Sequence, residues 1–181
     1  MDHGTTNTHE MNHGSMDHSE MGSSPGAADA PYDLQFLDTM IVHHQGAVDM
    51  ARDAENKAEH AELKAMARNV VTSQEKEIAE MRSWRGKWFP GAAPAINMEM
   101  AGMSDSMKDM DTTRLSSLTG SEFDLEFVKQ MTPHHEGAVI MAKEALERSQ
   151  KAEIKNLATS IIRDQEAEIK QMREWRAVWQ R

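Results

Sequence analysis

The chain has 181 residues, of which 39% are hydrophobic and 28% charged, as is ordinary for a folded globular protein. Its formal net charge of −10 disfavours a nucleic-acid partner, and no apolar run approaches the roughly 20 residues that would cross a bilayer. The absence of cysteine excludes disulfides and thiolate sites, whereas methionine occurs 16 times.

Residues 1–32 are predicted to form a disordered tail, because they are rich in small polar residues and almost devoid of branched aliphatic ones. They contain no basic and apolar leader, so we expect any signal peptide to have been removed or never to have existed. Histidine and methionine recur along the tail, which favours weak binding of Cu(II) and Cu(I), with a merely solubilising tail as the alternative. The predicted ligands in this tail are His3, His9, Met11, His13, Met16, His18 and Met21.

Residues 33–88 recur as residues 124–179 at a constant offset of 91 positions, and 25 of the 56 aligned residues are identical. In each copy two apolar stripes with a helical period flank a polar turn, so each copy predicts a helical hairpin. Two hairpins around one core predict an all-α fold, a ferritin-like four-helix bundle spanning residues 33–181. The expected helices are 33–57, 60–88, 123–149 and 151–180.

The linker, residues 89–122, separates repeat 1 (33–88) from repeat 2 (123–181) and begins with prolines that end the preceding helix. It is long enough to climb the bundle as a ferritin-like crossover, but a compact surface loop is equally allowed. Its methionines are two to four residues apart, a spacing that can bring three thioethers onto one ion. The alternative is a short amphipathic helix packed on the bundle. These methionines are Met98, Met100, Met103, Met107 and Met110.

The strongest chemical signal is Met-x-x-His-His-x-Gly-Ala-Val-x-Met-Ala, which occurs once in each repeat. On a helix the first methionine and both histidines point the same way, and the second methionine lies on the same face two turns after the first histidine. This face is the apolar one, where an unpaired polar group costs about 1–3 kcal/mol, so two matched histidine pairs favour metal binding over simple packing. The predicted ligands are Met40, His43, His44 and Met50, with Met131, His134, His135 and Met141.

The second helix of each repeat is expected to contribute residues to the same region. Met81 and Met172 are either additional ligands or ordinary core residues. Glu77 and Glu168 could orient the imidazoles, since metal-bound histidines usually require such a partner. Pro133 lies inside a helical pattern and is expected to kink that helix directly before its histidine pair.

The donor set indicates a soft ion. Di-iron bundles use Glu-x-x-His where this chain has Met-x-x-His, and thioethers select Cu(I) or Ag(I) over iron, manganese or magnesium. Zinc would require more nitrogen or thiolate ligands. Reliance on thioethers without cysteine suits an oxidising compartment, so we expect a periplasmic or secreted protein.

The repeated motif, with Gln-Glu-x-Glu-Ile-x-x-Met-Arg-x-Trp further along each repeat, resembles the family called domain of unknown function 305. The resemblance covers about residues 33–181 in two copies. It implies a ferritin-like helical bundle, commonly secreted or periplasmic; some members, including CopM-like proteins, bind copper or silver and contribute to metal resistance. It also implies that the two Met-His-His-Met sets are the ligands. Repeat 1 departs from the pattern at Val42, where repeat 2 has Pro133.

We therefore expect a protein that binds Cu(I), Ag(I) or both for sequestration, resistance or delivery, without catalytic turnover. Its expected partners are metal ions and another copper- or silver-handling protein, with no nucleic acid and no membrane. One alternative is a metal-dependent bundle oxidase resembling a cuprous oxidase. The other is a purely structural or partner-binding bundle in which the methionines only fill space.

Overall fold

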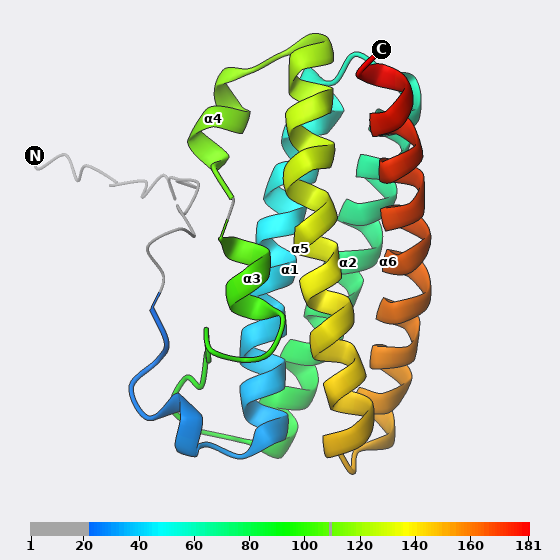
Figure 1. The fold of residues 1–181 in the computed structure, drawn as a ribbon. Coiled ribbons are helices and arrows are strands. Elements are labelled where there is room, and N and C mark those ends of the chain that lie inside the picture. Colours follow the sequence, from blue (N-terminus) through cyan, green and yellow to red (C-terminus); the bar gives the residue numbers. More distant parts are fainter. Residues whose placement is uncertain (1–21, 109) are drawn as a thin grey trace, which may run out of the picture.

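The computed structural model describes residues 22–108 and 110–181, and it contains four long helices side by side (Figure 1). Helices α1 and α2 form one hairpin and α5 and α6 form the other, which confirms the predicted four-helix bundle of two duplicated hairpins. The largest shift from the predicted bounds is at the start of α5, which begins at Gly120. Pro133 does not interrupt α5. The helices are α1 (Tyr32–Lys57), α2 (Ala61–Trp88), α5 (Gly120–Arg148) and α6 (Ala152–Trp179).

The core between these helices divides into two apolar clusters, each towards one end of the bundle. The lower cluster, at the end where α1 begins in Figure 1, is built around Phe36, Met81 and Ile154. The upper cluster, at the opposite end, is built around Leu63 and Phe127. Each fully buried side chain of this size contributes about 1.5–3 kcal/mol relative to an exposed one, so the two clusters provide most of the stabilisation of the fold.

The upper end of the bundle is fastened by one buried carboxylate. Asp124, at the start of α5, is fully buried and accepts hydrogen bonds from the backbone N–H groups of Glu59 (3.1 Å) and His60 (2.8 Å). These groups lie in the turn that precedes α2, where a negative charge also interacts favourably with the helix dipole. The first hairpin is thereby tied to the beginning of the second.

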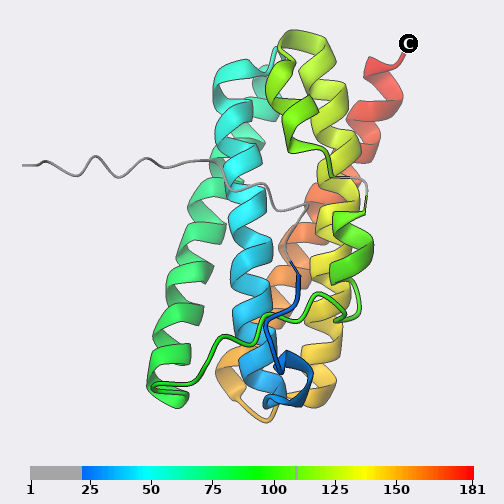
Figure 2. The same cartoon turned by 90° about the vertical axis from the view of Figure 1, so that its left-hand side faces the viewer.

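Residues 89–119 connect the hairpins as a crossover that climbs from the lower end of α2 to the upper end of α5 (Figures 1 and 2). The connection includes two short helices, α3 (Met103–Met107) and α4 (Thr112–Ser117), and it runs over the side of the bundle formed by α1 and α5. Its first part is held by Asp38, whose carboxylate accepts hydrogen bonds from Arg85 and from the backbone of Ala95. The crossover makes α2 and α5 parallel, which settles the open alternative in favour of the ferritin-like connection.

Residues 22–31 differ from the disorder expected for the tail. They contain a short 3-10 helix, η2 (Ala27–Asp29), and the backbone N–H of Ser24 donates to the carbonyl of Ile96 at 2.8 Å. The side-chain amide of Gln35 donates to the carbonyl of Ala30 at 2.6 Å. The physical reason is that the extended start of the crossover supplies backbone partners that composition alone does not reveal.

Two glycines allow α3 to lie directly on α5. Gly102 precedes α3 with φ of 88°, a left-handed conformation that favours glycine. A methyl group built on Gly102 would lie 2.4 Å from the carbonyl oxygen of Gly137, and one built on Gly137 would lie 2.3 Å from that of Gly102. The two backbones are therefore too close for any side chain between them.

Replacing Gly137 by alanine should lower the free energy of unfolding by about 1–3 kcal/mol, the usual cost of overpacking, because the new methyl group meets rigid backbone. Gly86→Ala is the matched control, since nothing lies within 4 Å of its added methyl group. Repeat 2 already carries Ala177 at that position. Urea unfolding should show a loss for Gly137→Ala and no loss for Gly86→Ala; equal effects would contradict the close approach.

Candidate metal centre

Four histidines meet between the two apolar clusters, and we call them the histidine layer. His43 and His44 come from α1, His134 and His135 come from α5, and each is at most 1% exposed. The rings of His43 and His134 stack across the contact between the two hairpins, with centroids 3.7 Å apart and an angle of 25° between their planes. The two copies of the repeated motif thus converge on one place inside the bundle.

Each repeat holds its second histidine with a carboxylate from the neighbouring helix. His44 Nε2 lies 2.7 Å from Glu77 Oε2, and His135 Nε2 lies 2.8 Å from Glu168 Oε2. These are equivalent positions in the two copies, and both glutamates lie against the imidazoles that the sequence predicts them to orient. A neutral imidazole that donates its Nε2–H to a carboxylate keeps a lone pair on Nδ1.

The Nδ1 lone pairs on these two rings have no partner within the described part of the chain. The Nδ1 atoms of His44 and His135 are buried, and neither has a hydrogen-bond partner among the described residues. A buried acceptor without a partner costs about 1–3 kcal/mol, and this cost occurs twice at symmetry-related positions. A metal ion coordinated by Nδ1 would remove the cost, so the geometry of both rings fits a metal ligand.

His43 is held in the neutral form by its surroundings. Burial, followed by repulsion from the imidazoles of His134, His44 and His135, lowers the pKa of His43 well below its ordinary value of 6.5. A neutral imidazole can bind a metal ion, whereas a protonated one cannot. The His43 imidazole is therefore suited to cation binding at neutral pH.

The linker also reaches the histidine layer, through a contact that the sequence does not signal. Ser106 of α3 donates its hydroxyl hydrogen to the carbonyl of Met103 at 2.8 Å. The Ser106 oxygen lies 3.1 Å from His43 Nε2, so it accepts the hydrogen bond and the imidazole donates. The close approach of Gly102 to Gly137 brings α3 near enough for this bond.

Methionines fill the core on both sides of the histidine layer, and they do not stay with their own repeat. Because α1 and α5 are antiparallel, the first motif methionine of one repeat lies with the second motif methionine of the other. The ligand sets predicted for single repeats are therefore divided between the clusters. The lower cluster contains Met40, Met81 and Met141, and the upper cluster contains Met50, Met131 and Met172.

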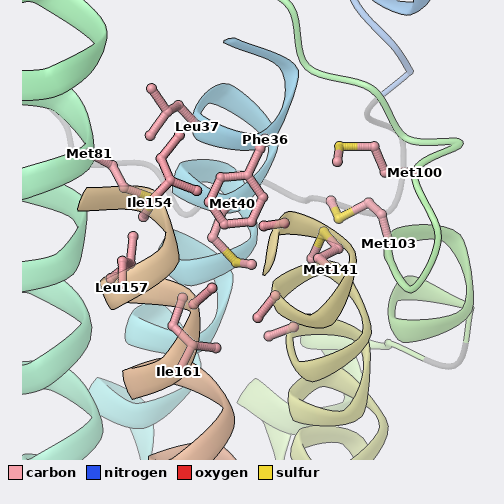
Figure 3. Packing of buried hydrophobic residues seen from close by; sticks show 14 of the residues in the cluster. Phe36, Leu37, Met40, Met81, Met100, Met103, Met141, Ile154, Leu157 and Ile161 are labelled. Atoms are coloured by element: carbon pink, nitrogen blue, oxygen red, sulfur yellow. The ribbon is translucent and has the colours of Figure 1, made fainter. Parts of the chain in front are cut away.

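The linker methionines are divided in the same way. Met100 and Met103 belong to the lower cluster, where they lie with Met141 (Figure 3), and Met110 belongs to the upper cluster. Met98 and Met107 are partly buried against the core. The structure has the alternative arrangement, a short helix packed on the bundle, because the crossover packs these side chains against the core around α3. They do not form a separate group on the linker.

Other predicted ligands are not brought to the layer by the described structure. The seven histidines and methionines predicted as tail ligands lie outside the described residues. Within residues 22–108 and 110–181, no three His, Asp or Glu side chains are arranged to hold a metal ion. Sequence reasoning did not single out Gln74 and Gln165, which are equivalent, buried and leave Oε1 without a hydrogen-bond partner in this part of the chain. Their identity in both copies was the available signal.

The chain matches a known protein family and a curated relative. The family described as Domain of unknown function (DUF305) matches residues 1–85 and again residues 86–176. A curated relative, the uncharacterized protein L153 of Acanthamoeba polyphaga mimivirus, is 41% identical over 51 residues. That match covers 28% of this chain and 34% of the relative, so the chain spans about a third of that protein's length.

Solved structures match over most of the chain. CopM in a Cu(I)-bound form is 42% identical with a TM-score of 0.69, covering 81% of this chain and 96% of CopM. CopM in an Ag-bound form is 41% identical with a TM-score of 0.69 over the same shares of the two chains. A DUF305 protein of Streptomyces coelicolor, described as secreted, is 29% identical with a TM-score of 0.71, covering 82% of this chain and 94% of that protein.

The metal-free protein should lose stability in acid because of His43. Its pKa is depressed in the folded state, so below about pH 6.5 the unfolded state binds more protons. The free energy of unfolding should then fall by up to about 1.4 kcal/mol per pH unit for each proton taken up on unfolding. Urea unfolding in the presence of a chelator, between about pH 7.5 and pH 5, measures this slope. His43→Gln should give a shallower slope, and an unchanged slope would contradict the assignment.

Proposed function

Since the chain belongs to the DUF305 family, we propose that it binds a monovalent soft metal ion, Cu(I) or Ag(I), at the histidine layer. The single observation that carries this proposal is the pair of buried Nδ1 atoms on His44 and His135. Each belongs to an imidazole whose other nitrogen is bonded to a carboxylate. This arrangement fixes the ring and leaves one lone pair for a metal ion, as in many protein metal sites.

The surroundings of the layer favour a monovalent ion over a divalent one. Neutral imidazoles are the nearest donors, and thioethers such as those of Met40 and Met131 lie one helical turn before the histidines on either side. Soft neutral donors suit Cu(I) and Ag(I), and burying one positive charge costs far less than burying two. The carboxylates of Glu77 and Glu168 add negative charge at the edge of the site. The Cu(I)-bound and Ag-bound forms of CopM, which resemble this chain, support the same two metals, although CopM also has a Cu(II)-bound form.

We propose that the ion is held and passed on rather than chemically converted. The carboxylates nearest to the layer, Glu77 and Glu168, are already hydrogen-bonded to imidazoles and so are occupied in positioning the rings. Sequestration, metal resistance and delivery to another copper- or silver-handling protein fit such a site. The tail histidines are a proposed secondary place for Cu(II). None of the described helices is both long enough and apolar enough to traverse a bilayer. We place the protein in the periplasm or outside the cell, in line with the DUF305 relative that is described as secreted.

Titration with Ag(I) in competition with a chelator tests the proposal. Replacing all four histidines of the layer by alanine should weaken retention by at least about 100-fold, since several coordinating nitrogens are lost together. His60→Ala is the matched control, because His60 is paired with Asp124 at the upper end of the bundle, away from the layer. Circular dichroism checks the fold of both variants. Retention that survives the loss of all four histidines would refute the assignment of the site.

Oxygen consumption separates binding from oxidase activity. Addition of Cu(I) to the purified protein under air should give no oxygen uptake beyond that of the same amount of Cu(I) in buffer. A stable metal-loaded state is expected, because the proposed site has no acid or base that is free of a structural role. Catalytic uptake over several turnovers, lost in the four-histidine variant, would instead establish the oxidase alternative.

A further inference from the structure

The two sides of the bundle around the histidine layer differ in how they are covered. The side formed by α1 and α5 carries the crossover (Figure 2). Ser106 of α3 lies 3.1 Å from Nε2 of His43. On the opposite side, α2 and α6 approach each other less closely than the other three neighbouring helix pairs do. The side of α2 and α6 is therefore the less closely packed side of the bundle.

A groove of about 380 Å³ lies on that opposite side, between α2 and α6. Its lining has four carboxylates and two cationic side chains, and each cation is near one of the carboxylates: Arg163 lies 2.7 Å from Asp164, and Lys76 lies 3.9 Å from Glu80. The groove thus has an excess of negative charge, which favours a cation over an anion. The charged lining residues are Lys76, Glu77, Glu80, Glu153, Arg163 and Asp164.

One lining residue connects this groove with the buried histidines. The Glu77 side chain is 14% exposed, and its Oε2 atom lies 2.7 Å from Nε2 of His44, which is 0% exposed. Glu77 therefore lines the groove and is also hydrogen-bonded to a histidine of the buried layer. Glu168, the equivalent residue of repeat 2, is 19% exposed, but it lines neither this groove nor another of about 660 Å³ on α5 and α6.

We propose that the groove between α2 and α6 is the path by which the metal ion reaches and leaves the histidine layer, with the Glu77 carboxylate at its inner end. This inference rests on the proposed function. Carboxylate oxygens along the groove replace water around the cation in steps, which lowers the desolvation barrier of entering the protein. Glu77 and Glu168 hold their imidazoles alike, but only the first also receives the passing ion. The duplicated protein is thus symmetric in binding and asymmetric in access.

A bulky residue in the groove tests whether the groove is a path or a binding site. If it is a path, the bulky residue slows uptake and release of the ion equally and leaves the dissociation constant unchanged. Ser160 lines the groove. Asn69 is its equivalent in repeat 1 and is exposed away from both grooves. Release of Cu(I) from the full chain to excess bathocuproine disulfonate, followed anaerobically by absorbance, should be slowed at least about tenfold in Ser160→Phe and unchanged in Asn69→Phe. Equal release rates in the two variants, both folded, would overturn the proposal.

A second pair of variants decides the matter if Ser160→Phe fails to fold. Glu77→Gln and Glu168→Gln should each weaken Cu(I) affinity by a similar factor of roughly 10 to 100, as is usual on loss of a residue that orients a metal ligand. The uptake rate constant, obtained as the release rate constant divided by the dissociation constant, is expected to fall for Glu77→Gln alone. Equal uptake rate constants would overturn the path. Failure of the unaltered protein to retain Cu(I) against the chelator would instead overturn the proposed function itself.

Discussion

Four imidazoles buried at the centre of a helical bundle impose the constraint on which the remaining structure depends. Each ring brings two polar nitrogens into the core, and the fold supplies a different partner for each position: a carboxylate for His44 and His135, a hydroxyl for His43, and ring stacking between His43 and His134. These partners account for Nε2 of each bonded ring and leave Nδ1 of His43, His44 and His135 without a hydrogen-bond partner among the described residues. A structure that tolerates this cost at three rings is organised for a ligand that is itself positively charged.

The flexible methionines suit the same constraint. Thioether side chains pack without strict shape requirements, so the core on either side of the histidine layer can adjust to a bound ion without loss of packing. Packing and coordination are thus compatible uses of one residue type. Burial of Met40 and Met141 is compatible with both uses. The neighbouring histidine layer is the reason to regard these thioethers as metal ligands.

The helices and the partnership of His44 with Glu77 could be predicted from the sequence, because both follow from the period of a single helix or hairpin. Features that join distant segments of the chain could not be predicted in this way. The contact of Ser106 with His43 depends on where the crossover lies, and a lone serine in a polar linker gives no signal of it. The mixing of methionines between repeats follows from the antiparallel arrangement of α1 and α5, which pairs residues by height in the bundle and not by position in the motif. Residues 22–31 were misjudged because backbone partners are invisible in composition.

The covalent joining of the two hairpins has a consequence for assembly. Either hairpin alone would carry one histidine pair and would have to find a second molecule before the stacked rings of His43 and His134 could meet. The crossover replaces that encounter by an intramolecular one, equivalent to an effective concentration on the order of millimolar for a short tether. A fused chain therefore keeps its histidine layer intact at any dilution, whereas a dimer of separate hairpins would come apart as the protein became scarce.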